Sequence, residues 1–148
     1  MDRQRHLIPA AVAALALAAP AALAALPGGA RYAGKTSDGS AVTLKLSGDG
    51  KNVKRMRIHY GLSCSKGRTA QSYTDILGPK VHKDRTFSTS GTYTGTQDGS
   101  KNTFHVSGKL SASKAHGRFS LKSSGRASDG SKVTCKTGQL TWSAKRKK

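Results

Sequence analysis

The feature that most constrains the fold is a turn motif that occurs twice. Residues 37–43 read Ser-Asp-Gly-Ser-Ala-Val-Thr, residues 128–134 read Ser-Asp-Gly-Ser-Lys-Val-Thr, and a shorter Asp-Gly-Ser stands at 98–100. Asp-Gly supplies the positive φ angles of a primed hairpin turn. After the first copy, apolar and polar residues alternate as far as Leu46. The motif therefore predicts tight hairpins that lead into half-buried strands.

Short alternating segments fill the rest of the chain. The clearest runs from Met56 to Cys64, where every second residue is apolar or half-cystine, the period of a strand with one buried face. Further strands are predicted at 31–36, 41–47, 71–77, 86–90, 92–96, 104–110, 116–124, 132–136 and 139–143, with a weak edge segment at 80–85. The sequence predicts an all-β domain over 31–144, an antiparallel β-sandwich or flattened barrel of nine to ten short strands connected mostly as a meander. Residues 145–148, Lys-Arg-Lys-Lys, are predicted to form a frayed basic tail.

The N-terminal segment has the pattern of a signal peptide. A short basic region precedes an Ala/Leu run from Leu7 to Leu26, and Ala22 and Ala24 are small residues of the kind a signal peptidase reads. An uncleaved membrane anchor is the alternative, since such a run approaches the roughly 20 residues of a span. Pro9 and Pro20 interrupt the run and favour cleavage. The sequence therefore predicts a signal peptide at 1–25, a secreted or envelope-associated protein, and no membrane span after cleavage.

Cys64 and Cys135 are the two cysteines of the chain. In an exported protein, two cysteines most simply form one disulfide. Each stands on the apolar face of its predicted strand, so the bridge is expected in the interior. The histidines do not cluster with them at metal-ligand spacing. We therefore predict a disulfide and neither a metal nor a cofactor.

Several of these features resemble one group of proteins. The signal-like N-terminus, the Tyr-x-Gly-x-Thr opening at Tyr32, the strand ending in Cys64 and the closing Cys-x-x-Gly-x-x-x-Trp from Cys135 to Trp142 look like small secreted β-sandwich proteins of high-GC Gram-positive bacteria. The resemblance covers residues 31–144 and rests on structural motifs. It implies the sandwich fold and assigns no functional residue, because the group has no established activity.

The chain is strongly basic, with 26 Lys and Arg against seven Asp, no Glu, and a formal net charge of +19. Four of the aspartates precede Gly, where turn chemistry accounts for them. A charge of this size attracts polyanions such as nucleic acid, anionic envelope polymers or acidic membrane surfaces. The alternative is that it keeps an exported β-domain soluble and its strand edges unpaired.

The basic side chains are spread over the outward positions of several predicted strands, at Lys45, Arg55, Arg57, His59, His105, Lys109, Arg118, Lys122, Lys132 and Lys136. We predict as polyanion-binding residues Lys45, Arg55, Arg57 and His59. Binding is expected to be weak and without sequence preference, because neutralising phosphates needs little more than positive charge. No specific nucleic-acid partner is predicted. Sugar or base recognition usually adds outward aromatic rings, and the candidates for that role are Tyr32, Tyr73 and Tyr93.

A catalytic role is the competing hypothesis. Outside the Asp-Gly turns and the N-terminal segment, only Asp75 and Asp84 are left for chemistry that needs carboxylates. A small secreted hydrolase would have to use isolated residues such as His59, His105 and Asp75, brought together in one pocket. The sequence favours a non-catalytic binding protein at the cell envelope.

Overall fold

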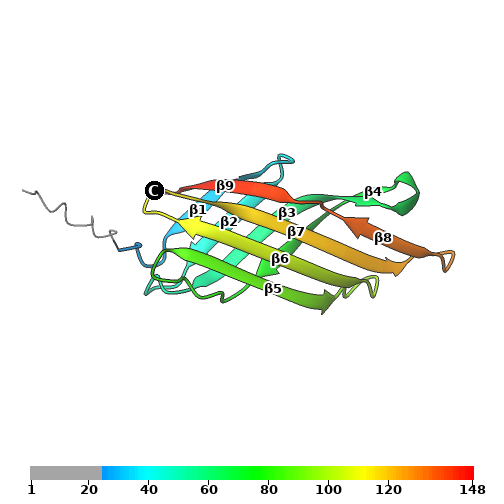
Figure 1. The fold of residues 1–148 in the computed structure, drawn as a ribbon, viewed down its shortest axis with the longest axis horizontal. Helices are drawn as coiled ribbons and strands as arrows, with labels where there is room; N and C mark the ends of the chain where they lie inside the picture. Colours follow the sequence, from blue (N-terminus) through cyan, green and yellow to red (C-terminus); the bar gives the residue numbers. More distant parts are fainter. Residues whose placement is uncertain (1–24) are drawn as a thin grey trace, which may run out of the picture.

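The computed structural model describes residues 25–148, which form one antiparallel sheet of nine strands (Figure 1). Most of the predicted signal peptide at 1–25 lies outside the described residues. The strands are β1 (Arg31–Thr36), β2 (Ala41–Leu46), β3 (Val53–Cys64), β4 (Thr69–Ile76), β5 (Thr86–Thr94), β6 (Lys101–Leu110), β7 (Lys114–Arg126), β8 (Lys132–Lys136) and β9 (Leu140–Arg146). A single 3-10 turn, η1 (Ser65–Gly67), is the one helical element in this part of the chain. The predicted all-β, antiparallel fold is confirmed.

The two copies of the turn motif form the same structure. In each copy the Asp stands at the centre of a hairpin. Lys35 therefore pairs with Ala41 in the first copy, and Arg126 pairs with Lys132 in the second. The glycine has a φ of 84° in the first copy and 81° in the second. The aspartate before it is not in the left-handed region, so the predicted primed turn is wrong. The carboxylate instead accepts the N–H of the serine two residues on, at 3.0 and 2.9 Å.

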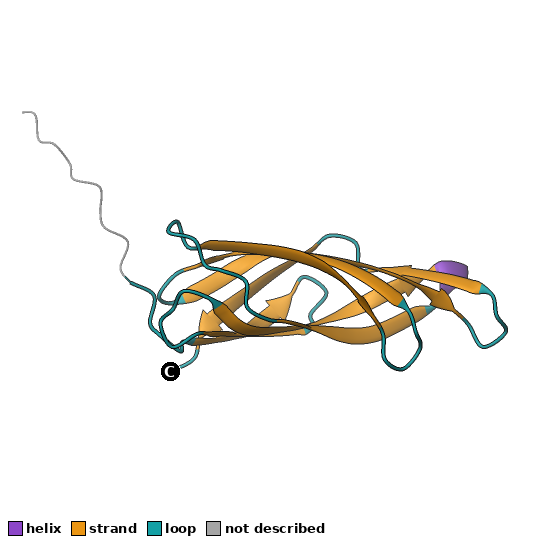
Figure 2. Cartoon of the chain, turned by 90° about the horizontal axis from the view of Figure 1, so that it is seen from below, coloured by secondary structure: helices purple, strands orange, loops and turns teal. Residues whose placement is uncertain are grey.

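The sheet closes on itself through β8. Its order is β4-β3-β2-β1-β9-β7-β6-β5, and β8 pairs with both β3 and β7. Six strands (β3, β2, β1, β9, β7 and β8) therefore make a closed barrel, and β4, β5 and β6 extend it. Figure 2 shows the result from below as a flattened tube of strands with loops at both ends. Where β8 meets β3, only Ser63–Lys136 and Cys64–Cys135 are paired.

The core lies between the inward faces of these strands. Tyr60 of β3 stacks on Phe119 of β7 with ring centroids 5.2 Å apart, across the flattened tube. The ring centroids of Phe87 and Trp142 lie 6.2 Å apart, and the two rings occupy the space over Gly108. A Cβ at Gly108 would come within 2.5 Å of Phe87 and 2.7 Å of Trp142. Two of the largest side chains of the thin core can therefore pack here only because residue 108 has no side chain.

Six predicted strands differ from the observed ones by one to three residues at an end, and three predictions were wrong in a larger way. The segments at 86–90 and 92–96 form one strand, β5, which continues through Gly91, where the ring of Phe104 fills the space a side chain would take. The segment at 80–85 is not a strand and holds one isolated bridge, between Lys80 and Asn52. The basic tail begins later than expected, because Lys145 and Arg146 pair with β1 inside β9.

A disulfide joins Cys64 to Cys135, as predicted. Both half-cystines are only partly buried and lie outside the core, so the expected interior position is wrong. The reason is that both strands run past the end of the core at this point, and the bridge ties β8 to β3. Such a bond is typical of the oxidising compartments outside the cytoplasm. No helix among residues 25–148 has the length and apolar character that a membrane span requires.

Candidate anion-binding site

The four predicted polyanion-binding residues lie on one outer face, formed by β2 and β3. Lys45 stands directly opposite Arg55, and His59 pairs with Tyr73 of β4. His59 and Tyr73 pack with ring centroids 5.4 Å apart. Strand alternation, which the sequence predicted, brings these four residues to one surface.

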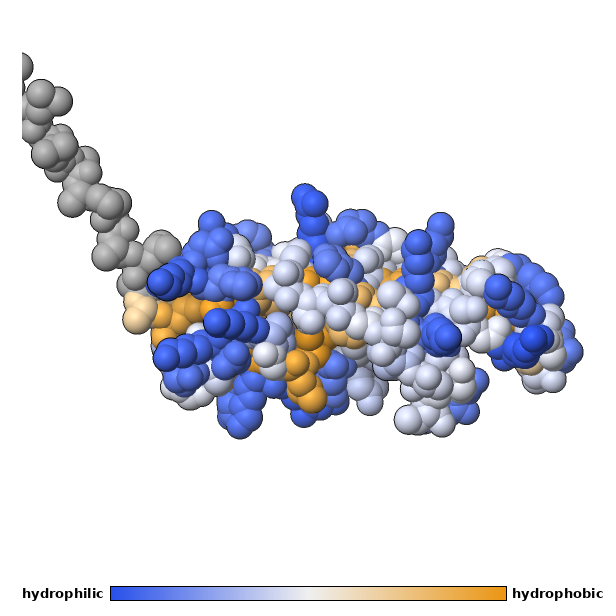
Figure 3. Space-filling model, turned by 60° about the horizontal axis from the view of Figure 1, so that its bottom comes forward, coloured by the Kyte–Doolittle hydropathy of each residue, from blue (hydrophilic) through white to orange (hydrophobic). Residues whose placement is uncertain are grey.

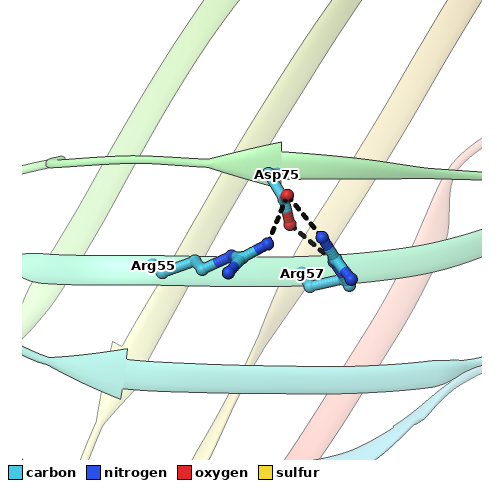
Figure 4. A network of polar contacts seen from close by, with 3 residues as sticks. All are labelled: Arg55, Arg57 and Asp75. Atoms are coloured by element: carbon cyan, nitrogen blue, oxygen red, sulfur yellow. Dashed lines mark hydrogen bonds and ion pairs between the residues drawn. The ribbon is translucent and has the colours of Figure 1, made fainter.

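An acid neutralises much of this surface. Asp75 of β4 accepts two hydrogen bonds from Arg57 and one from Arg55, each 2.7 Å long (Figure 4). The bond from Arg57 is the main cause that holds the pKa of Asp75 well below its usual range. Arg57 also lies over the ring of Tyr73, with its guanidinium carbon 4.5 Å from the ring centroid. Because a bidentate pair commits the donors of an arginine, this cluster offers less free positive charge than the sequence indicates.

The residues named for a hydrolytic site do not share a pocket. Asp75 is occupied by the two arginines, and His59 packs on Tyr73 beside it. His105 lies on β6, a strand that pairs with neither β3 nor β4. None of the three lines one of the five principal cavities of residues 25–148.

The largest of these cavities is a groove of 680 Å³ on the outer face of β6, β7 and β8, where β8 reaches β3. We call it the lysine groove, after four lysines that line it: Lys101, Lys122, Lys132 and Lys136. It also contains hydroxyl side chains, those of Ser63, Ser65, Thr103, Ser123, Ser124 and Thr134. The lining contains no acid, and the half-cystines Cys64 and Cys135 form part of it. The volume is within the range of about 300–1,000 Å³ that is usual for ligand sites.

Two pairs of like charges face each other across β7 and β8 in and beside the groove. Lys122 is directly opposite Lys136, and Arg126 is directly opposite Lys132. Like charges at such positions destabilise a sheet, because their Cβ atoms are only about 5 Å apart. Both ion pairs found among residues 25–148 involve Asp75, so none of these four bases has a carboxylate partner there. The groove therefore gathers lysines that form no ion pair among these residues, and one acid, Asp98, lines an adjoining cavity with Arg126 and Lys132.

Sequence reasoning placed Lys122, Lys132 and Lys136 on outward faces but did not group them, and it missed Lys101. A signal was available in the turn motif. A hairpin centred on Asp129 pairs residues that are equally far from it, which brings Lys122 opposite Lys136. Lys101 was missed because the predicted strand began at residue 104, whereas β6 begins at Lys101.

The three tyrosines proposed for stacking have different environments. Tyr32 is buried, with 1% of its surface exposed, so its predicted outward position is wrong. It lies on the inward face of β1, and its hydroxyl reaches the carbonyl of Ser111 at 2.8 Å. Tyr73 and Tyr93 are exposed by 51% and 36%. These two remain available for contact with a ligand.

Among residues 25–148, no three side chains of His, Cys, Asp or Glu come together as a metal site would require. Comparison of the chain with protein families, curated proteins and solved structures finds no match. The site must therefore be interpreted from its own geometry.

Proposed function

We propose that this is an exported, non-catalytic protein that binds anionic polymers of the cell envelope through the lysine groove. The observation that carries the proposal is the pair Lys122 and Lys136, directly opposite each other and without a carboxylate partner among the described residues. A polyanion seated in the groove would remove a repulsion that the free protein has to bear. Export is supported by the signal-like N-terminus and by the disulfide.

The geometry of the groove favours cooperative action of its charges. Facing lysines on adjacent strands are closer than the Debye length, which is about 8 Å at 0.15 M salt. Their attraction for one anionic chain therefore adds up under physiological conditions, whereas bases dispersed around a barrel would be screened from one another. The hydroxyl groups of the lining can donate hydrogen bonds to phosphate, sulfate or carboxylate oxygens.

Two double variants of equal net charge test the site. Lys122→Gln/Lys136→Gln changes the groove, and Arg55→Gln/Arg57→Gln changes the arginine cluster. On a heparin column, we expect the groove variant to elute at clearly lower salt than the wild type and the arginine variant to elute close to it. With oligo(dT) as a second polyanion, the slope of log K against log salt should fall by about 1.4 for the groove variant, about 0.7 for each lost contact.

The arginine variant is the matched control, because it removes the same formal charge. Equal shifts for both variants would mean that only net charge matters and would leave the solubility interpretation. A larger shift for the arginine variant would instead support the residues predicted from the sequence. Thermal unfolding of each variant checks that the fold is retained, and the groove variant should be at least as stable as the wild type because it removes a repulsion.

A further inference from the structure

A second cavity lies between the two outermost strands of the sheet, β4 and β5. It has a volume of 390 Å³ and lies beside the β5–β6 turn. The residues important here are Tyr60, Tyr93, Gln97, Asp98 and Asn102. We call it the tyrosine pocket. It adjoins the lysine groove, with which it shares Ser123, but Lys101 and Thr103 of β6 line the groove whereas Asn102 lines the pocket.

The charge of this pocket sets it apart from the rest of the molecule. Its lining contains no Lys, Arg or His, although 26 of the 148 residues are Lys or Arg. The other four principal cavities of residues 25–148 each have basic side chains in their lining. Figure 3 brings forward the side on which β5 lies, and the middle of this face is pale and orange, with strongly hydrophilic side chains around it. A pocket without bases does not attract anions, and its one acid, Asp98, accepts the backbone N–H of Ser100 within the turn at 3.0 Å.

Tyr93 provides a fixed aromatic surface in the pocket. Its hydroxyl lies 2.9 Å from the hydroxyl of Thr74, which in turn lies 2.8 Å from that of Tyr60. This chain of hydroxyls links β5 to β4 and β3 across the open side of the sheet. Phe104 packs against the ring with the centroids 6.3 Å apart. The ring is therefore held in place while about a third of the residue, 36%, stays exposed.

Asn102 provides an oriented polar group beside that ring. The residue is 7% exposed, and its amide nitrogen donates to the carbonyl and the hydroxyl of Ser100 at 3.2 and 3.1 Å. Gln97 and Asp98 add an amide and a carboxylate to the lining. These groups can accept and donate hydrogen bonds to hydroxyls without requiring a charged ligand.

We propose that the tyrosine pocket binds a neutral sugar residue of a glycan. A sugar ring has an apolar face of C–H groups, which fits against an exposed aromatic ring, and a rim of hydroxyls, which fits the amides and the carboxylate. The volume suits a ligand site, because it lies within the usual range of about 300–1,000 Å³. The proposal does not depend on anion binding in the lysine groove.

The test uses neutral hexasaccharides of glucose, N-acetylglucosamine and mannose, each at about 10 mM, a concentration that detects affinities as weak as millimolar. Salt at about 0.5 M suppresses attraction to the basic surface. We expect at least one of the sugars to shift the backbone amide NMR signals of Tyr93, Gly95, Gln97 and Asn102. Absence of shifts at these residues with all three sugars would overturn the proposal, as would shifts confined to the lysine groove.

Three variants separate binding from folding. Tyr93→Ala should weaken binding at least about tenfold, as expected for a central aromatic contact, whereas Tyr93→Phe keeps the ring and should stay within about threefold of the wild type. Thr92→Ala, at the preceding position of β5, is the control and should bind normally. If Tyr93→Ala binds as well as the control, the pocket is not the site. Because the sugars are neutral and the salt is high, failure here leaves the heparin result unaffected.

Discussion

Removal of the disulfide would show how far the closure of the barrel depends on a single bond. The variant Cys64→Ala/Cys135→Ala leaves no free thiol, and the bond that it removes spans 71 residues of sequence. In the chain-entropy account, a loop of this length contributes about 4 kcal/mol to the free energy of unfolding. Domains of this size are typically stable by only about 5–15 kcal/mol. We therefore expect a large loss of stability, with the fold retained at low temperature.

The loss should also be uneven, because β8 meets β3 through just two residue pairs. Without the bond, little else holds that end of the barrel closed. Urea unfolding followed by the fluorescence of Trp142, which is buried in the core, measures the global effect. Amide hydrogen exchange at Cys135 and Lys136, compared with Val106 at the centre of β6, measures the local one. We expect exchange in β8 to accelerate more than exchange in β6.

Two results would refute this reasoning. A loss below about 1 kcal/mol would mean that the unfolded chain gains little freedom, against the entropic account. Equal acceleration of exchange in β8 and β6 would mean that the bond stabilises the whole barrel equally and has no additional effect at the end where β8 meets β3. Opening of that end should also weaken heparin binding, since Lys136 lines the lysine groove and pairs with β3.

Two further predictions concern packing and pH. Gly108→Ala should cost about 3 kcal/mol or more in urea unfolding, because the new methyl group overlaps the rigid rings of Phe87 and Trp142; Gly48→Ala, where nothing lies within 4 Å, is the control and should change stability little. Partial burial opposes ionisation of Asp38, but hydrogen bonds from Thr36 and from two backbone N–H groups outweigh it and lower its pKa to about 2. Since the unfolded value is about 3.9, the charge stabilises the fold above that pH, and this stabilisation is lost as the pH falls through 2. Asp38→Asn should therefore be less stable than the wild type by about 1 kcal/mol near pH 7, a figure reduced for solvent exposure. The difference should vanish below pH 2; a difference that persisted there would show that the charge is not its cause.

Much of the fold could be predicted because its signals are local. The Asp-Gly-Ser turns depend on a glycine with positive φ and on a carboxylate that accepts the N–H of the residue two positions on, and both effects act within four residues. Period-two alternation then marked β3, from Met56 to Cys64, and gave the bounds of β1 and β8 without error. Two cysteines in a chain with a signal-like N-terminus were enough to predict the bridge.

The arrangement of the strands was not predictable in this way. Residues 145–146 looked like a tail, because their strand character comes from pairing with β1, which is far away in the sequence. Tyr32 looked exposed, because nothing local shows that the inward face of β1 lies over the core. Gly91 looked like a break in β5, because only the ring of Phe104 explains the missing side chain.

For the candidate sites, too, the sequence determined some properties and the tertiary structure determined others. The sequence by itself determined that the protein is basic, disulfide-closed and all-β, since composition, cysteine number and alternation are properties of the chain. Only the tertiary structure decided which bases act together. It joined Arg55 and Arg57 to Asp75 and placed Lys122 opposite Lys136 without an acid. The physical reason is that charge is counted along the chain, whereas neutralisation depends on distances of a few ångströms that the register between strands sets.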